Sequence, residues 1–449
     1  MPGLIGQDAF ERVAKAAIDL PGADGVEVVL IHEWGGLTRF ASSEIHQSTW
    51  REDTGLRVRV VSAGRIGVAA SNDFSEAGAR AAAESALEMA GVVSADPYFG
   101  GLAPRAPVHA TDGFDERTAT ATPDLRSEGV ATLVAQCPPG FTAAGAFETT
   151  AVEVAVATTE GQVCWAPVTQ ASLTTVVTGG EGGAGFAESF ARRVEEIDPE
   201  AIGRRAEGKA RDSQNPRPLE PGIYEVVLEP NAVSTLVGFL AYMGFGGRSI
   251  AEGRSCFSGK EGEKVASSNI TIYDDALAAD TIGVPFDFEG TPRRRVDLVR
   301  NGVFLDGVYD LRTATQAGKQ TTGHALPAPN PEGPFPLNLY MQTGDASMEE
   351  LIGSVQRGLL ITRFHYSNVV HPVESTITGM TRDGTFLIED GEVKHPVTNF
   401  RFTQSILEAL SAVSMVASES ELASEFFFSA SRVPGLRIDR FQFTGRSDH

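Results

Sequence analysis

The chain has 449 residues, of which 42% are hydrophobic and 21% charged, a composition typical of a soluble globular protein with two or three domains. Its 37 basic and 59 acidic residues give a formal net charge of −22, which disfavours binding to nucleic acid or to an anionic membrane because both are polyanions. The longest uncharged run, residues 231–247, is too short and too rich in glycine for a membrane span.

The cysteines and the N-terminus indicate the compartment. Cys137, Cys164 and Cys256 are scattered and form no C-x-x-C pair or disulfide framework, which favours a reducing environment. The first residues contain no basic region followed by a continuous apolar run, so they do not resemble a secretory signal. We therefore expect a cytoplasmic protein.

Residues 1–95 are predicted to form an α/β N-terminal domain. Residues 25–31 are typical of a buried strand, and aliphatic residues alternate with arginines in a half-buried strand at residues 56–60. Asp73 and Glu76 fit a capping box, which predicts a helix that starts there. A Gly- and Pro-rich linker follows at residues 96–114.

A middle domain is predicted for residues 115–215. Valines alternate at 152, 154 and 156, and a turn at Glu160-Gly161 predicts a hairpin. Asp198 and Pro199 are typical of a helix start, since the first caps the free N–H groups and the second suits the first turn.

The remaining part, residues 222–449, is predicted to be a β-rich C-terminal domain. Asn301-Gly302 and Asp390-Gly391 each separate two strand-like runs, and both pairs accept the positive φ angles of two-residue hairpins. A Pro-dense insertion at residues 321–336 interrupts the pattern, and loops of this length are often functional. A helix is expected near residues 405–416.

The side chains that could carry chemistry give only weak signals. No H-E-x-x-H or H-E-x-x-x-H sequence occurs. A zinc site formed by His324, His365 and His371 stays possible, although a structural role is favoured for each. Arg254 could lower the pKa of Cys256, but a lone cysteine is more often a small buried apolar residue.

Acidic pairs allow two interpretations. Asp287 and Glu289 are two residues apart, and Asp274 and Asp275 follow a strand-like run. Such pairs can perform acid–base chemistry or bind a cation, but carboxylates that form turns are the favoured interpretation.

Four segments, taken in order, resemble the TldD/PmbA family. They are LTRFASSEIHQSTWREDTGLRVRVVSAGRIGVAASNDFS, VASSNITIYDDA, FDFEGTPRRRVDLVRNGVFLDGVYDLRTATQAGKQTTGHA and GTFLIEDGEVKHPV. The resemblance runs from about residue 25 to residue 415. It implies an α+β fold, with an α/β N-terminal domain, a middle region and a C-terminal domain of curved antiparallel sheet.

The resemblance also implies a two-subunit metallopeptidase. The TldD-type subunit carries H-E-x-x-x-H on a helix and binds zinc through it, because zinc needs imidazole ligands and a glutamate activates the bound water. The PmbA or TldE type lacks this motif. In this chain the corresponding helix, residues 231–243, places Gly238, Phe239 and Met243 at or near the motif positions. None of these can bind zinc or act as a base, so we assign no catalytic residue and no metal ligand.

The main hypothesis is a non-catalytic subunit of a TldD/PmbA-type peptidase. It would contain no cofactor of its own, pair with a TldD-like homologous subunit that holds the zinc, and help to enclose an unfolded or precursor peptide. The candidate peptide-binding residues are Gly323, His324, Arg363 and His365, on a surface that could hold a peptide by strand addition. Two alternatives stay open, a stand-alone hydrolase with a different site and a homo-oligomeric binding or scaffold protein.

Overall fold

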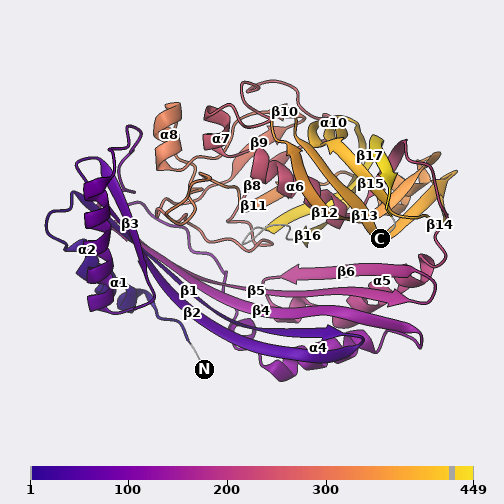
Figure 1. Cartoon of the computed structure of the whole chain (residues 1–449), viewed down its shortest axis with the longest axis horizontal. Helices are drawn as coiled ribbons and strands as arrows, with labels where there is room; N and C mark the ends of the chain where they lie inside the picture. The colour runs from indigo at the N-terminus through magenta and orange to yellow at the C-terminus, as the bar shows by residue number, and fades with distance from the viewer. Residues whose placement is uncertain (1–2, 424–429, 448–449) are drawn as a thin grey trace.

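The computed structural model of the chain describes residues 3–423 and 430–447. It contains two β-sheets, one above the other in Figure 1. The first sheet has six antiparallel strands in the order β3-β2-β1-β4-β5-β6. Its strands are β1 (Gly25–Ala41), β2 (Glu44–Ser62), β3 (Arg65–Ser71), β4 (Phe141–Thr158), β5 (Val163–Gly179) and β6 (Gly183–Ala191).

Alternate residues of β1 face opposite sides of the first sheet. Val28 and Leu30 pack with the helices α1 and α2, whereas Val29 packs with Phe286 of the C-terminal half. Further along the same strand, Phe40 packs with α4 and α5. The first sheet is therefore a middle layer between these helices and the C-terminal half. The helices of the N-terminal half are α1 (Gln7–Ile18), α2 (Glu76–Val92), α3 (Glu116–Ala119), α4 (Pro123–Val134), the 3-10 turn η1 (Val194–Glu196) and α5 (Pro199–Asp212).

The second sheet has eleven strands and lies in the C-terminal half. Two of its pairings are parallel, β11 with β17 and β7 with β12, while its remaining pairings are antiparallel. The strands are β7 (Ile223–Leu228), β8 (Ile272–Asp274), β9 (Val296–Arg300), β10 (Val303–Phe304), β11 (Asn338–Met341), β12 (Arg357–His371), β13 (Thr376–Glu389), β14 (Glu392–Pro396), β15 (Phe400–Ser405), β16 (Val413–Ala423) and β17 (Ala430–Arg446).

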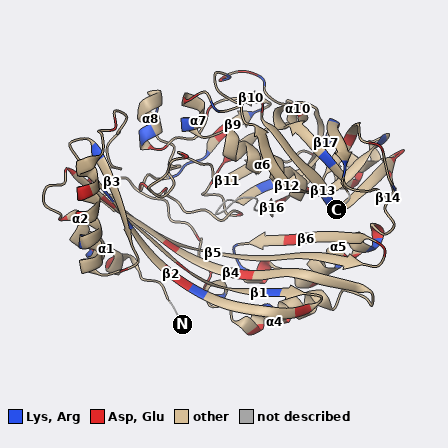
Figure 2. Ribbon diagram, in the orientation of Figure 1, with Lys and Arg blue, Asp and Glu red and all other residues tan. Residues whose placement is uncertain are grey.

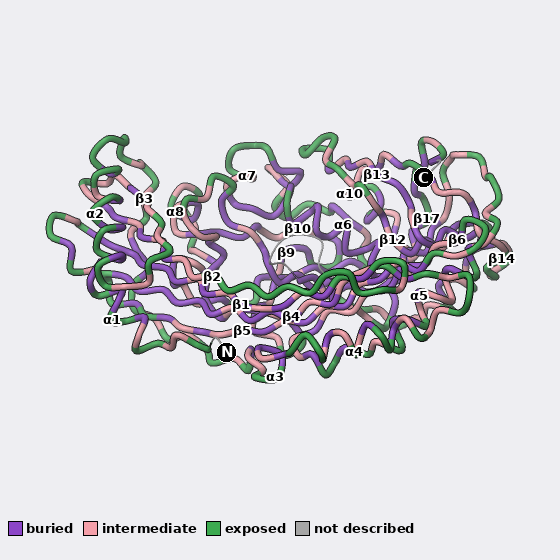
Figure 3. Tube along the Cα trace, turned by 60° about the horizontal axis from the view of Figure 1, so that its bottom comes forward, coloured by how far each residue is buried: buried purple, intermediate pink, exposed green. Residues whose placement is uncertain are grey.

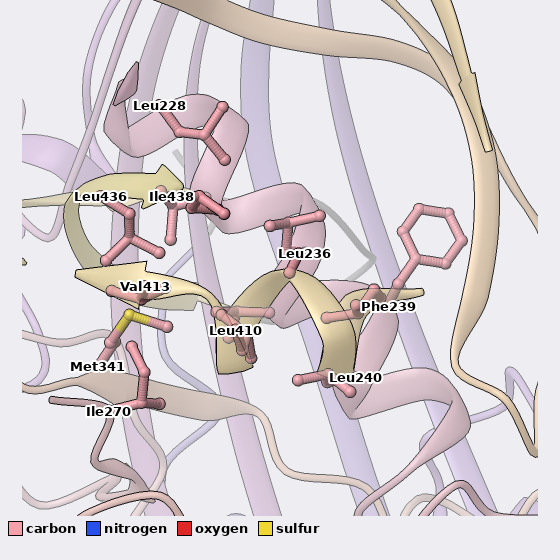
Figure 4. Packing of buried hydrophobic residues seen from close by; sticks show 14 of the residues in the cluster. Leu228, Leu236, Phe239, Leu240, Ile270, Met341, Leu410, Val413, Leu436 and Ile438 are labelled. Atoms are coloured by element: carbon pink, nitrogen blue, oxygen red, sulfur yellow. The ribbon is translucent and has the colours of Figure 1, made fainter. Parts of the chain in front are cut away.

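The largest core cluster fills the space between the second sheet and the helix α6 (Pro230–Met243). Leu236 and Leu240 of this helix pack near Leu410 and Val413 (Figure 4). Buried segments follow most strands of both sheets, whereas the exposed segments are mainly loops, outer helices and the first half of β2 (Figure 3). The other helices of this half are α7 (Gly247–Ala251), α8 (Leu311–Ala317), α9 (Met348–Gly353) and α10 (Ile406–Ser411).

Charged side chains join the two halves. Arg312 Nε donates to Asp96 Oδ2 at 2.6 Å, and Arg205 Nη1 donates to Glu421 Oε1 at 2.8 Å. Acidic and basic residues are interspersed over both halves rather than separated into two faces (Figure 2). Within residues 3–423 and 430–447, no helix is long and apolar enough to cross a membrane.

The α+β prediction is confirmed, with one difference: the C-terminal sheet is mixed rather than wholly antiparallel. All three predicted hairpins are present, β4–β5, β9–β10 and β13–β14. Asp198 caps α5 as predicted, since its Oδ1 accepts from Glu200 N and Ala201 N at 3.0 Å each.

Two local expectations change. The cap of α2 is Ser75, whose Oγ accepts from Gly78 N at 3.0 Å, and not the Asp73–Glu76 box. The helix expected at residues 405–416 ends at Ser411, because the chain enters β16 at Val413. The first sheet takes β1–β3 from the predicted domain 1–95 and β4–β6 from the predicted domain 115–215. The division of the chain into domains 1–95, 115–215 and 222–449 stays a prediction.

Candidate functional site

The helix α6 lies at the centre of the candidate site. Pro230 occupies its first turn, and Glu229 before it forms an ion pair with Lys209 of α5. Every residue of α6 is buried except Tyr242, whose exposed fraction is 54%. The helix therefore packs its apolar residues on nearly all sides, as expected for a helix in the interior of a protein.

The three motif positions predicted from the resemblance lie within this buried helix. Gly238, Phe239 and Met243 are all buried. The ring of Phe239 points away from the cluster around Leu236 and Leu240 (Figure 4). No side chain of α6 is an imidazole, thiolate or carboxylate, which are the groups that bind zinc in proteins.

Two of the candidate peptide-binding residues, Gly323 and His324, are buried at the start of the Pro-rich segment. His324 Nε2 lies 2.9 Å from Asp274 Oδ1, and its Nδ1 lies 3.0 Å from both Thr322 O and Thr322 Oγ1. Gly323 has φ +75°, and a Cβ there would lie 2.8 Å from Pro292 O. Both residues hold the chain in place locally, and their contact with a peptide stays a prediction.

The other two candidates, Arg363 and His365, lie on β12 and are partly exposed. Arg363 Nε donates to Asp383 Oδ2 at 2.8 Å, and its guanidinium carbon lies 4.0 Å from the ring centroid of Phe186 on β6. Burial, together with the positive charges of Arg363 and Arg382, lowers the pKa of His365. This pair lies several strands away from β8, to which His324 is bonded.

An apolar cavity of about 450 Å³ lies between the first sheet and the C-terminal half. The first sheet contributes one wall, and the end of α6 with the loop after it contributes a second. The Pro-rich segment and residues 282–293 complete it. Its lining residues include Ile31, Val152, Val154, Val168, Gln170, Ala241, Tyr242, Ile282, Val284, Phe288, Arg293, Leu326, Pro327, Phe335 and Asn338.

Besides Asn338, the buried polar side chain in this lining is Arg293, which is only 3% exposed. Its Nη1 donates to Asn338 Oδ1 at 3.0 Å, while its Nε is buried without a hydrogen-bond partner. Asp274 lies in the same cluster and accepts from Asn338 N at 2.7 Å. Burial acts to raise the pKa of Asp274, but His324, Arg293 and this N–H together lower it. The cavity wall therefore includes a buried cation held beside an ionised carboxylate.

A second group of buried charges joins the first sheet to the C-terminal half. Arg59 on β2 donates from Nη2 to Glu27 Oε2 at 2.5 Å and from Nη1 to Glu289 Oε1 at 3.0 Å. Burial raises the pKa of Glu27 to about 7, although Arg59 opposes this shift. Two carboxylates thus share one buried guanidinium.

Asp287 forms a turn, as the favoured interpretation predicted. Its Oδ1 accepts from Glu289 N and Thr291 N at 3.0 and 2.9 Å, and its Oδ2 accepts from Ala325 N at 2.9 Å. This side chain therefore anchors the Pro-rich segment against the turn at residues 287–291.

The structure favours neither a zinc site formed by histidines nor an activated Cys256 thiolate. Among the residues that it describes, no group of three or more His, Cys, Asp or Glu side chains is arranged to hold a metal ion, and this includes His324, His365 and His371. Cys256 is buried, and burial raises its pKa to about 12. The favoured interpretation of Cys256 as a small buried residue is therefore confirmed, because desolvation outweighs the opposing charge of Lys260.

The Pro-rich segment was recognisable from the sequence, whereas most of the cavity was not. Arg293 was not recognised because it lies in the run Arg293-Arg294-Arg295, in which only the first residue is buried. The alternating valines of β4 were a usable signal, since Val152 and Val154 face the cavity.

Comparison with known protein families gives two matches. Residues 221–445 match the family described as PmbA/TldA metallopeptidase C-terminal domain, and residues 26–90 match PmbA/TldA metallopeptidase domain 1. The first match alone covers half of the chain.

Individual proteins resemble the chain over most of its length. It is 27% identical over 398 residues to a metalloprotease of Methanothermobacter thermautotrophicus, covering 83% of each chain. It is 23% identical over 446 residues to metalloprotease PmbA of Escherichia coli O157:H7, covering 96% of each.

Solved structures share the fold. TldE from Thermococcus kodakarensis superposes with a TM-score of 0.88 at 23% identity, covering 97% of this chain and 100% of that one. A protein of Thermotoga maritima described as a putative modulator of a DNA gyrase has a TM-score of 0.87 at 18% identity, with the same coverage. At these identities the similarity establishes the fold alone.

Proposed function

This chain belongs to the PmbA/TldA metallopeptidase family, and we propose that it is a non-catalytic subunit of a peptidase complex whose zinc lies in a TldD-like homologous chain. The observation that carries this proposal is α6. The helix occupies the position of the metal-binding helix suggested by the resemblance, yet its residues are apolar or small and almost wholly buried. A water-activating zinc site needs ligands and a base that α6 does not offer.

The chain's role in the complex is to help enclose and bind the peptide substrate. The apolar cavity beside the end of α6 supports this role, because it combines an accessible apolar surface with a few polar groups, as ligand sites generally do. The substrate is an unfolded protein or a precursor peptide. Arg363 and His365 are partly exposed on β12 and stay candidates for peptide contact. Three free cysteines fit action in the reducing cytoplasm.

The test is reconstitution with a TldD-like homologue that carries H-E-x-x-x-H. The two chains are co-expressed with a tag on this one, and the complex is measured by size-exclusion chromatography with light scattering. Zinc per chain is measured by mass spectrometry, and cleavage is measured on an unstructured peptide. We expect zinc and cleavage in the complex and neither in this chain alone.

A matched control removes the motif from the homologue, which should abolish cleavage and leave the complex intact. Stoichiometric zinc and peptide cleavage by the isolated chain would support the stand-alone hydrolase instead. A stable homo-oligomer that excludes the homologue would support the scaffold alternative.

A further inference from the structure

The cavity beside α6 leaves apolar side chains only partly covered. Ile31, Val152, Val284, Phe288 and Leu326 line it and are half-buried rather than buried. Soluble proteins seldom leave a contiguous apolar surface uncovered unless it binds something. The volume of about 450 Å³ lies within the range typical of ligand sites, roughly 300–1,000 Å³.

The walls give the cavity a defined shape. Ile31, Val152 and Val168 come from three adjacent strands of the first sheet and form an aliphatic wall. The Pro-rich segment, whose contribution includes Leu326-Pro327, contributes another wall. Ala325 N donates a hydrogen bond to Asp287 Oδ2, which fixes this segment. Proline also restricts the backbone, so this wall is in place before a ligand arrives.

The buried charge of Arg293 affects which side chains the cavity can accept. Arg293 contributes a buried guanidinium to the lining, and its Nε has no acceptor. A cationic side chain placed in the cavity would lose its hydration and find no buried carboxylate in the lining, since Asp274 beside Arg293 is already paired with Arg293 and His324. A main-chain carbonyl, in contrast, is an acceptor that a guanidinium attracts. At the outer edge, Tyr242 and Glu332 are exposed, so a chain that enters the cavity can continue into solvent.

We propose that this cavity binds large apolar side chains of an unfolded polypeptide and excludes lysine and arginine side chains. The inference rests on the proposed function and specifies its substrate class. Large apolar side chains are buried in folded proteins and become available when the chain unfolds. A complex with this site therefore distinguishes unfolded from folded protein by the residues it accepts, without reading a particular sequence.

The first test measures binding to the purified full-length chain without any partner. Fluorescently labelled peptides of equal length carry Leu-Phe, Ala-Ala or Lys-Lys at their centre, and affinity is measured by fluorescence anisotropy. We expect the Leu-Phe peptide to bind at least about tenfold more tightly than the Ala-Ala peptide, since each large side chain leaves water. The Lys-Lys peptide should bind most weakly.

Filling the cavity tests where the peptide binds. Leu326→Trp and Ile282→Trp place a larger side chain into it, and Val92→Trp adds the same ring at the exposed end of α2, where Val92 is 85% exposed. We expect both cavity variants to lose the preference for Leu-Phe and Val92→Trp to keep it. Thermal melting identifies any variant that fails to fold, and the second cavity variant then carries the test.

Two results would overturn the inference. One is an unchanged preference for Leu-Phe in a folded cavity variant. The other is tight binding of a fluorescent fatty acid that Leu326→Trp abolishes, together with no binding of the Leu-Phe peptide, because the occupant would then be a lipid.

Reconstitution separates this inference from the proposed function. In a complex that cleaves peptide, Leu326→Trp should raise KM for the Leu-Phe peptide at least about tenfold with little change in kcat. Cleavage that does not respond to Leu326→Trp refutes the inference and leaves the proposed function standing. Failure of the complex to form refutes the proposed function, and the binding preference of the isolated chain then decides the inference alone.

Discussion

Arg59 on β2 donates a hydrogen bond to Glu289 of the C-terminal half at 3.0 Å, and both side chains lie largely away from solvent. The same guanidinium also pairs with Glu27 on β1. The contact between the first sheet and the C-terminal half, on which the cavity depends, therefore includes one buried guanidinium shared by two carboxyl groups.

Removing this guanidinium should weaken the whole fold. Arg59→Met leaves two buried carboxylates without their cation, and we expect a loss of about 3–5 kcal/mol in the free energy of unfolding. Chemical denaturation followed by circular dichroism measures it. The matched control is Arg51→Met on the same strand. Arg51 pairs with Glu33 but is mostly exposed, so its loss should cost about 0–1 kcal/mol. Equal costs for the two variants would contradict the prediction.

Stability should fall as the pH rises through the titration of Glu27. Burial raises its pKa from 4.5 to about 7, so between these values the folded chain holds a proton that the unfolded chain has lost. The stabilising contribution of this proton is complete below pH 4.5, the ordinary pKa, and is lost as the pH approaches about 7, the pKa in the folded chain. Thermal melting from about pH 5 to pH 8 tests this. Glu27→Gln should show a smaller decrease, and an identical pH profile would count against Glu27 as the source.

His324→Ala should act on stability. The substitution leaves Asp274 buried without the imidazole that lies 2.9 Å from its Oδ1, and we expect a loss of about 3 kcal/mol. His371→Ala, at an exposed position on β12, should cost less than about 0.5 kcal/mol. Denaturation of both variants measures the difference. A fully stable His324→Ala chain with weakened peptide binding would support the prediction that His324 contacts the peptide directly.

Gly323→Ala should be costlier than the same change at Gly318. Both glycines have positive φ, +75° and +65°, but a Cβ at Gly323 would meet Pro292 O at 2.8 Å whereas one at Gly318 meets nothing within 4 Å. The shared backbone strain costs about 1–2 kcal/mol, and the close contact at Gly323 adds about 1–3 kcal/mol. Denaturation of the two variants gives the comparison. If Gly318→Ala is as destabilising, the close contact at Gly323 is not the cause.

Local signals were sufficient where a few neighbouring residues determine the structure. Asn301-Gly302 predicted its hairpin because both residues adopt positive φ there, and Asp198 predicted the start of α5 because its carboxylate reaches two N–H groups close by. The apolar character of α6 was likewise visible in its own residues. Signals of this kind need no knowledge of the rest of the fold.

The cavity could not be derived in the same way. Arg293 is buried because Asn338 and Asp274 lie beside it, and neither of them is near it in the sequence. His324 was a peptide-binding candidate in the Pro-rich insertion, and its ring bonds to a strand residue fifty positions earlier. Such positions depend on how distant segments meet, and periodicity within one segment carries no information about that.

The pairing of β1 with β4 has a consequence for how the chain is made. β1 ends at Ala41 and β4 begins at Phe141, yet the two strands are hydrogen-bonded along nearly their whole length. At a translation rate of roughly 5–20 residues per second, the ribosome needs about 5 to 20 seconds to synthesise the intervening segment. During that interval the edge of β1 lacks its neighbour and is open to pairing with other nascent chains. The first sheet can therefore be completed only after β4 has emerged.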